Sequence, residues 1–210
     1  AIELSKRGHV IADPSDYDVA IVFIEKTANL NVSKPYVHRL DGIWFKPNEI
    51  DTKNNSIKQT YAGATQAVFQ SQFDRTMIEK WFGPQTGSVI PNGIELGEVE
   101  ISPDIEDLRA RYDRIFICSS NWHRQKRLKE NIQLYLHLKK NMKETCCLVV
   151  LGNNPDHVVA GNDIFYTGAS IPHEICLQFY AVADWMIHLA WADHCPNVVV
   201  EALSQGCPVI

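Results

Sequence analysis

The sequence predicts an α/β protein with two parallel-sheet units, because strand-like runs alternate with helical stretches in two separate series. In the first series, strands are expected at residues 17–24, 35–40, 67–70 and 88–91, and helices at 57–62 and 74–82. In the second series, strands are expected at 114–118, 146–151, 164–166 and 185–191, and helices at 128–141, 173–183 and 198–203. Such alternation is typical of parallel sheets covered by helices.

An acidic stretch that contains Pro103 separates the two series, and we expect the connection between the units there. The predicted organisation is a first domain at residues 1–95, an interdomain connection at 96–112 and a second domain at 113–210. The chain begins without Met on a run that resembles a helix end, and it ends on a run that resembles the start of a strand. We therefore expect a fragment in which each domain is incomplete at one end.

Composition argues against several classes of protein. The chain has 210 residues, of which 45% are hydrophobic and 10% aromatic, as in a folded globular protein. Its formal net charge of −5 gives no general attraction to nucleic acid. No apolar run is long enough to span a bilayer, and no signal peptide is visible. The six cysteines contain no Cys-x-x-Cys pair, so we expect reduced, mostly buried thiols in a cytoplasmic protein.

The strongest functional signal lies in residues 193–210. The expected helix at 198–203 has apolar side chains on every side, so we predict a buried helix that contains Glu201. A buried carboxylate is costly unless it is hydrogen-bonded. Because Asp193 lies in the loop between a strand and this helix, the run predicts a pocket at the carboxyl end of a strand. Phosphate-bearing ligands bind at such places in α/β sheets.

This run closely resembles the donor-site signature of retaining glycosyltransferases of family 4, whose GT-B fold has two Rossmann-like domains facing a cleft. In that signature an acidic residue and a glutamate, with seven residues between them, surround a Pro-Asn pair, and Gly-x-Pro-Val-Ile follows. Asp193 stands where many members have Glu, and the spacing to Glu201 is kept. The resemblance implies that Glu201 hydrogen-bonds the ribose hydroxyls of a nucleotide and that Asp193 faces the transferred sugar. The alternatives are a structural buried carboxylate for Glu201 and a helix-capping role for Asp193.

Basic residues that follow the expected strand at 114–118 form a second candidate cluster. Lys126 and Arg124 precede a helix, where cations are disfavoured, so a diphosphate-binding role is favoured over a solvated basic turn. Members of the family carry an Arg and a Lys in this loop. Lys126 matches the Lys position, whereas Asn121 occupies a familiar Arg position and Arg124 is displaced toward the Lys.

Two turns complete the predicted donor-binding set. Asn197 and the N–H group of Val198, at the start of the last helix, are candidates for phosphate contacts, although an ordinary N-cap explains Asn197 equally well. The Thr-Gly turn at Gly168 and Ser170 resembles the turn whose backbone meets the nucleotide base in the family. By itself that turn is a weak signal, since similar turns occur throughout α/β proteins.

On the first domain, the end of the strand at 35–40 supplies the candidate catalytic residues on the acceptor side. The family carries a polar residue there, often His or Asp. Asp41 falls nearest to that position and His38 is second. A core-facing or capping role is equally compatible with either residue.

From these residues we predict a retaining, hexosyl-type glycosyltransferase of carbohydrate biosynthesis. It would move a sugar from a nucleotide-diphosphate donor to a sugar, lipid-linked glycan or other small acceptor. Lys126, Arg124 and the helix N-terminus would stabilise the departing diphosphate, so no metal or other cofactor is expected. Neither nucleic-acid binding nor a transmembrane segment is expected. Two alternatives remain open, a non-catalytic nucleotide-sugar-binding module and a GT-B sugar-nucleotide epimerase.

Overall fold

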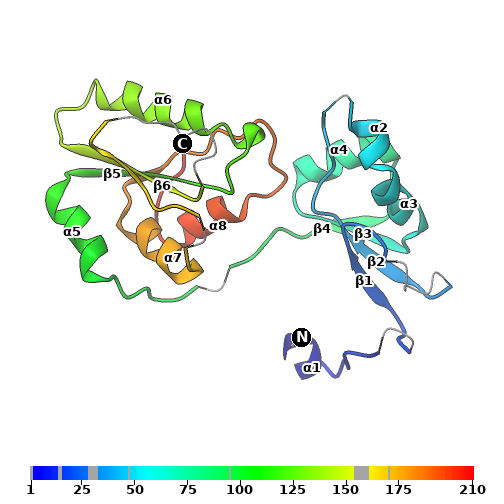
Figure 1. Cartoon of the computed structure of the whole chain (residues 1–210). Helices are drawn as coiled ribbons and strands as arrows, with labels where there is room; N and C mark the ends of the chain where they lie inside the picture. The colour runs from blue at the N-terminus through cyan, green and yellow to red at the C-terminus, as the bar shows by residue number, and fades with distance from the viewer. Residues whose placement is uncertain are drawn as a thin grey trace. The chain divides into compact units, whose positions relative to one another are not determined.

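The computed structural model describes residues 2–13, 16–27, 33–46, 48–94, 96–153, 161–169 and 171–210. The chain divides into two compact units, Ala1–Pro91 and Asn92–Ile210. Within the described ranges, each unit holds a four-stranded sheet in which all paired strands are parallel (Figure 1). The α/β class with two parallel sheets, predicted from the alternating pattern, is confirmed.

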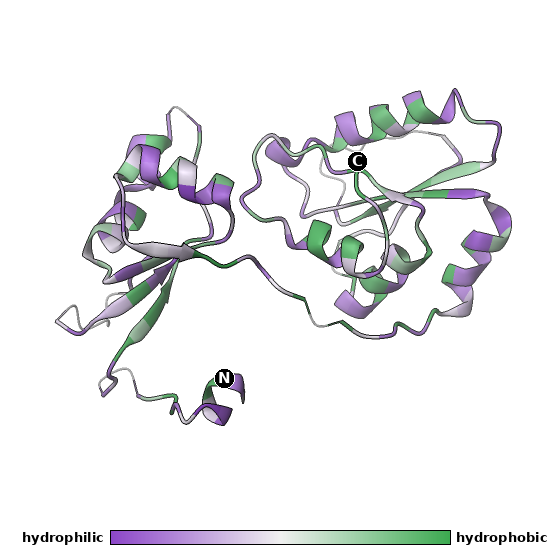
Figure 2. Ribbon diagram, turned by 180° about the vertical axis from the view of Figure 1, so that it is seen from behind, coloured by the Kyte–Doolittle hydropathy of each residue, from purple (hydrophilic) through white to green (hydrophobic). Residues whose placement is uncertain are grey.

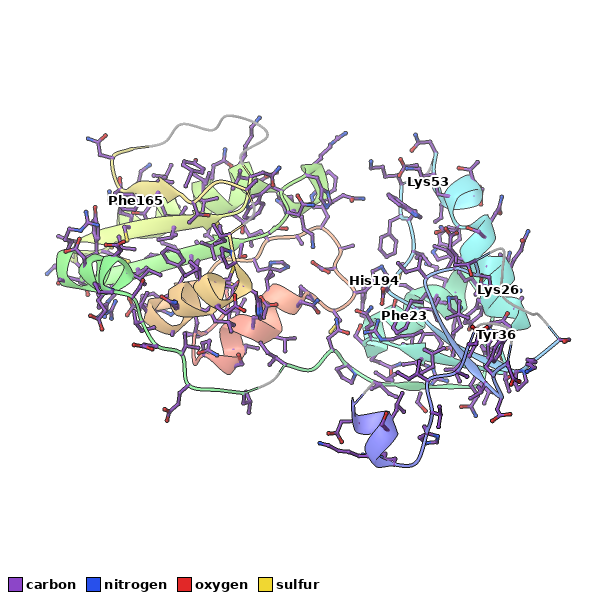
Figure 3. All side chains as sticks on the ribbon, turned by 60° about the horizontal axis from the view of Figure 1, so that its bottom comes forward. Phe23, Lys26, Tyr36, Lys53, Phe165 and His194 are labelled. Carbon is purple, nitrogen blue, oxygen red and sulfur yellow. The ribbon has the colours of Figure 1, made fainter. Side chains whose placement is uncertain are left out.

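The first unit orders its strands β1-β2-β3-β4. Its elements are α1 (Ile2–Lys6), β1 (Ala20–Phe23), β2 (Tyr36–Arg39), α2 (Ile50–Lys53), α3 (Asn55–Gly63), β3 (Gln66–Phe69), α4 (Gln72–Phe82) and β4 (Gly87–Val89). Its largest apolar cluster joins the strands to α3 and α4 through Leu40, Ile57, Phe69 and Ile78. A second, smaller cluster contains Tyr36, and the Lys26 ammonium lies 5.3 Å from the centroid of the Tyr36 ring; Figure 3 labels both residues.

Helix α4 begins two residues before the start predicted from its periodicity. The Ser71 hydroxyl accepts a hydrogen bond from the Asp74 N–H at 3.0 Å, and the Asp74 carboxylate accepts one from the Gln70 N–H at 3.0 Å. These reciprocal bonds resemble a capping box, which satisfies donors that a helix start leaves without intrahelical partners. Ser71 is thus the N-cap, and the helix starts at Gln72.

The second unit orders its strands β7-β6-β5-β8. Its elements are α5 (Pro103–Arg111), β5 (Arg114–Ser119), the 3-10 turn η1 (Arg124–Lys126), α6 (Leu128–Lys139), β6 (Cys146–Leu151), β7 (Ile164–Tyr166), α7 (His173–Val182), β8 (Trp185–Met186) and α8 (Asn197–Ser204). A parallel bridge from Met186 to Val209 continues the sheet beside β8.

Side chains of the central strand β5 alternate between two cores, so the second unit has three layers. Phe116 and Cys118 pack on the side of α6, whereas Ile115 and Ile117 pack on the side of α5, α7 and α8. Every residue of β6 is buried, as expected for a strand covered on both faces. Each fully buried Leu or Val side chain contributes about 1.5–3 kcal/mol to stability through removal of apolar surface from water. Figure 2 shows the complementary pattern on α6, where green and purple segments alternate along the ribbon.

Helix α5 occupies most of the segment that was predicted as an interdomain connection. Pro103 stands in its first turn with acidic residues, and Leu108 is buried in the core of the second unit. Proline and acidic side chains are both favourable at a helix start. The acidic, proline-containing composition that suggested a linker therefore marks the beginning of a helix.

Strand β8 is shorter than the strand predicted at 185–191 and ends at Met186. Beyond it, the Leu189 N–H donates to the Asn131 side chain at 3.1 Å, and the Trp191 N–H donates to the Gln125 carbonyl at 3.1 Å. Backbone donors that would have bonded to a neighbouring strand thus find partners on α6 and η1. Within the predicted strand Met186 and Ile187 are buried, whereas Trp191 at its end is 59% exposed, so the predicted strand was too long.

All six cysteines lie in the described ranges and are free thiols, and four of them are buried: Cys118, Cys146, Cys147 and Cys207. Burial raises the pKa of the Cys147 thiol to about 12. The prediction of free, mostly buried thiols is confirmed. In the part of the chain that the structure describes, no helix is long and apolar enough to cross a membrane.

Asp184 anchors the turn before β8 to β5. Its carboxylate accepts the Ile115 N–H at 2.8 Å and pairs with Arg109, whose Nη2 lies 2.9 Å from Oδ1. Burial raises the pKa of this carboxyl, but Arg109 and the Ile115 amide outweigh burial, and the pKa lies below its ordinary value. The ionised form is therefore the one that stabilises the fold.

We expect Asp184→Asn to lower the free energy of unfolding by roughly 2–3 kcal/mol near neutral pH, because a charged hydrogen-bond acceptor is lost. A carboxyl whose pKa is lower in the folded state stabilises above its unfolded pKa of about 4, and that stabilisation disappears as the pH falls through the folded pKa. The difference in free energy of unfolding between wild type and variant, measured with urea, should therefore be smaller at about pH 3 than near neutral pH. Asp107→Asn, on the exposed face of α5, is the matched control. An equal difference in free energy of unfolding at both pH values would contradict this role of Asp184.

Candidate functional site

The carboxyl ends of β5 and β6 open into a pocket of about 400 Å³. Its lining comes from the ends of these strands, the loops after β5, β6 and β7, and the starts of α7 and α8: Ser119, Ser120, Asn121, Leu151, Gly152, Asn153, Ala169, Ile171, Cys176 and Val198. All strands of a parallel sheet end at one edge, which is why residues far apart in the sequence meet here. The volume suits a small-molecule ligand.

Two of the predicted donor-binding residues, Asn121 and Val198, line this pocket together. Gly168 precedes the lining residue Ala169, and Ser170, which follows it, lies outside the described residues. The predicted set does not include other lining residues such as Asn153. Their signal was their position at strand ends, which many loop residues share.

The backbone around the pocket is fixed by contacts between the loops that follow β5 and β6. Gly152 has φ 106°, and a Cβ atom there would lie 2.1 Å from the Ser120 carbonyl oxygen. Asn153 Oδ1 accepts the Trp122 N–H at 2.8 Å, and the Trp122 indole N–H donates to the Leu151 carbonyl at 2.8 Å. Only glycine has the conformational freedom and the small size that position 152 requires.

Gly168 lies across an antiparallel bridge from Gly152. Its φ is 79°, and among the described residues no atom beyond its chain neighbours lies within 4 Å of the point that a Cβ would occupy. The turn therefore presents bare backbone to open space, which is a suitable surface for close approach of a planar ligand.

Lys126 and Asp193 form an ion pair between η1 and the loop that follows β8. The two side chains are 23% and 20% exposed, so water screens the pair only partly. His188 Nε2 lies 3.4 Å from the Asp193 carboxylate, and His194, labelled in Figure 3, follows Asp193 directly. Burial raises the pKa of Asp193, but His188 and Lys126 outweigh burial, and the pKa lies below its ordinary value. Asp193 is thus an anion at neutral pH.

Helix α8 is half-buried, which corrects the prediction of a helix buried on all sides. Among its residues Ala202 is buried, whereas Leu203 is 57% exposed. Periodicity showed apolar character on every face but could not show which faces other elements cover. Helix α8 therefore packs at the edge of the core and leaves one face exposed.

Glu201, in the middle of α8, keeps a side chain that is 17% exposed, and His173 Nε2 of α7 lies 3.3 Å from its carboxylate. Burial and then the Glu201 charge raise the pKa of Cys176, a pocket-lining thiol. Glu201 therefore acts electrostatically on the pocket. The imidazole supplies the structural partner that the alternative interpretation of Glu201 requires, so the geometry is compatible with both roles.

Asn197 is the first residue of α8, and Pro196 occupies the N-cap, so the N-cap alternative for Asn197 is wrong. The Asn92 side-chain amide donates to Asn197 Oδ1 at 2.6 Å and to the Cys195 carbonyl at 3.1 Å. Asn92 thus holds the approach to the helix N-terminus. The sequence signalled only a turn at Asn92, not this contact.

Arg124 lies away from the pocket that Asn121 and Val198 line. Its guanidinium lies over the Trp191 ring, 5.7 Å from the centroid, and it lines a separate hollow of about 490 Å³ at the start of α6. The structure therefore brings Lys126 together with Asp193 but does not bring Arg124 into the same pocket as Asn121.

In the first unit, His38 and Asp41 have different environments. His38 is completely buried, and its Nε2–H donates to the Ile24 carbonyl at 2.8 Å. Burial lowers the pKa of His38 despite the opposing effects of that bond and of the Asp41 charge. Asp41 lies at the exposed end of the strand, in contact with the Arg39 and Gln70 side chains. Of the two acceptor-side candidates, only Asp41 is at the surface.

No family model matches this chain, and no curated protein matches it. Solved structures do match over most of its length. A sucrose-phosphate synthase from Thermosynechococcus elongatus is 16% identical with a TM-score of 0.64, over 84% of this chain and 49% of that chain. OtsA, in an apo structure, is 12% identical with a TM-score of 0.69, over 91% of this chain and 57% of that chain.

An E. coli structure, described as trehalose-6-phosphate bound with UDP-2-fluoro glucose, is 13% identical with a TM-score of 0.69, over 91% of this chain and 57% of that chain. The chain thus spans about half the length of the solved chains that it matches. At these identities the likeness establishes the fold alone. The chain has the α/β GT-B fold of solved glycosyltransferases, with a parallel sheet in each of two units.

Proposed function

We propose that this protein is a glycosyltransferase that takes a sugar from a nucleoside-diphosphate donor, with the donor bound at the carboxyl edge of the second unit. The observation that supports this most strongly is the pocket of about 400 Å³ in which Asn121 and Val198 meet beside the Gly168 turn. Ligands of open α/β sheets bind at this edge. The E. coli structure of the same fold was described with a bound UDP-sugar analogue, which agrees with a ligand of this class.

Several of the candidate residues have roles in this proposal that suit their chemistry. The base would lie against the bare backbone at Gly168, and Glu201 would accept hydrogen bonds from the ribose hydroxyls. Asn197, the Val198 N–H and Lys126 would face the diphosphate, where a helix N-terminus and an ammonium both favour negative charge. Binding of the donor would then draw Lys126 toward phosphate while Asp193 turns to the sugar.

We further propose that the transfer retains the anomeric configuration of the sugar, as in family 4, and needs no metal ion. The bond from the anomeric carbon to the donor phosphate breaks, and a bond to the acceptor oxygen forms on the same face of the sugar. The acceptor proton passes to the departing phosphate, so the main task of the protein is to stabilise the developing diphosphate charge. We assign the acceptor side to Asp41 rather than to the wholly buried His38. Addition of a chelator would then leave donor binding unchanged.

We expect one of UDP, GDP and ADP to raise the melting temperature of the protein, and Glu201→Ala to remove that shift. A ligand at a hundredfold excess over its Kd stabilises the folded state by about 2.7 kcal/mol. Differential scanning fluorimetry measures the effect, and Glu106→Ala, on an exposed position of α5, is the matched control. A shift that persists in Glu201→Ala would reject the ribose role of Glu201. The absence of a shift with all three nucleotides would reject the donor pocket.

A further inference from the structure

Asn131 is a buried amide of α6 that hydrogen-bonds to both loops of the candidate site. It is 1% exposed. Its Nδ2 group donates to the carbonyls of Lys126 and Arg127, at 3.1 and 2.7 Å, and its Oδ1 accepts the Leu189 N–H at 3.1 Å. Both N–H groups and the acceptor of the primary amide are therefore engaged. No charged or apolar side chain of the same size offers this combination.

The first loop needs this support because Arg127 adopts an unfavourable conformation. Its φ and ψ are 58° and 52°, left-handed values that residues with a Cβ rarely adopt. The turn ends η1 and begins α6, and it determines the direction in which the preceding Lys126 side chain leaves the backbone. The shorter of the two Asn131 bonds, at 2.7 Å, goes to the carbonyl of this strained residue.

The second loop is joined to the first at three neighbouring points. Asn131 binds Leu189, the Gln125 carbonyl accepts the Trp191 N–H at 3.1 Å, and the Lys126 ammonium pairs with Asp193. Of the residues in these contacts, Asn131 is the buried one, whereas the charged pair is partly exposed. The placement of Lys126 relative to Asp193 thus depends on a residue that contacts neither charged group.

We propose that Asn131 is a positioning residue that holds the Lys126 turn and the segment after β8 in the register that diphosphate binding requires. The inference rests on the proposed function, because it assigns the diphosphate to Lys126. A purely structural Asn131 would support the fold and all ligands equally. A positioning Asn131 affects the part of the ligand that Lys126 contacts, which is the terminal phosphate.

The test compares the Kd of UDP with that of UMP by calorimetry, or the corresponding guanine or adenine pair if that base stabilises the protein. The variants are Asn131→Asp, Asn131→Leu, Lys126→Met and the double variant Lys126→Met/Asn131→Leu. Asn141→Asp, at an exposed position just beyond the end of the same helix, is the control. Asn131→Asp keeps the shape but replaces a donor with an acceptor that faces two carbonyls.

We expect the preference for diphosphate over monophosphate to fall by about tenfold in Lys126→Met and in each Asn131 variant. The double variant should show no further loss, because both substitutions disrupt one unit. Asn141→Asp should keep the full preference. If both affinities fall together in the Asn131 variants, or if the double variant loses the sum of the two effects, the positioning role is overturned.

The failure of the proposed function has a different signature. If wild type shows no preference for UDP over UMP, or if Lys126→Met leaves it intact, the diphosphate assignment itself is wrong, whatever the Asn131 variants do. If the Asn131 variants do not fold, amide hydrogen exchange on the wild-type protein decides. UDP should slow exchange of the Leu189 amide more than UMP does, and equal protection by both would overturn the inference.

Discussion

Gly152→Val is expected to prevent stable folding of the second unit or, at the least, to abolish nucleotide binding. A Cβ at this position would lie 2.1 Å from the Ser120 carbonyl oxygen, a distance that real atoms do not reach, and φ is 106°. The β-branched side chain of Val is especially unfavourable at such a φ value. Because the nearest neighbour is the Ser120 backbone, directly after β5, the ends of the strands themselves would have to move.

Urea unfolding and UDP, GDP or ADP binding measure this effect. We expect a loss of more than about 4 kcal/mol, the range in which a single substitution points to a specific steric or backbone conflict. Gly93→Val is the control, since in the part of the chain that the structure describes no atom beyond its chain neighbours lies within 4 Å of its Cβ position. A Gly152→Val protein with unchanged stability would show that the loops after β5 and β6 do not pack as described.

Lys126→Met is expected to lower the rate of sugar transfer by about 10²–10³-fold, the cost of removing one group that stabilises developing negative charge. Met preserves most of the side-chain length but removes the ammonium. The substitution also removes the ammonium that pairs with the partly buried Asp193 carboxylate, so the folded protein should be somewhat less stable as well.

The rate is measured as release of nucleoside diphosphate from a nucleotide sugar. Transfer of the sugar to water, that is hydrolysis, is the minimal reaction. Lys143→Met, an exposed lysine in the turn before β6, should behave as wild type. Equal rates in both variants would remove Lys126 from the reaction. Nucleotide binding without any turnover in wild type would instead favour a non-catalytic nucleotide-sugar-binding module.

The elements that the sequence predicted well are those whose signal is local. The apolar run at 146–151 became the fully buried strand β6 with the same bounds, and the short run at 164–166 became β7. An all-apolar stretch of this length, bounded by polar turns, has few other stable arrangements in an α/β protein. The apolar character and the length of these two runs were sufficient to predict both strands.

Contacts between distant residues explain where the prediction failed. β8 stops early because Asn131 and Gln125 supply partners to the chain that follows it, and neither contact is visible in the sequence of the strand. Helix α5 appeared as a linker because its polar surface dominates its composition, while two buried apolar residues, Ile105 and Leu108, were too few to indicate a core contact. The exposure of α8 likewise depends on which neighbours cover it.

The candidate site was predicted by resemblance rather than by geometry. The structure brings Asn121 and Val198 into one pocket and pairs Lys126 with Asp193, but it directs Arg124 to the Trp191 side of the loop. The left-handed Arg127 alters the course of that loop, and no local pattern predicts a left-handed arginine. The roles of these residues remain predictions until a ligand is measured.

The most direct test of the account is an NMR titration of the amide resonances with UDP, GDP and ADP. If the second unit binds a nucleoside diphosphate as proposed, one nucleotide will shift the amides of Asn121, Gly152, Gly168 and Val198, while the amides of α5 on the opposite edge remain in place. If no nucleotide shifts these resonances, or if the shifts cluster away from the carboxyl edge of the sheet, the proposed donor site is wrong.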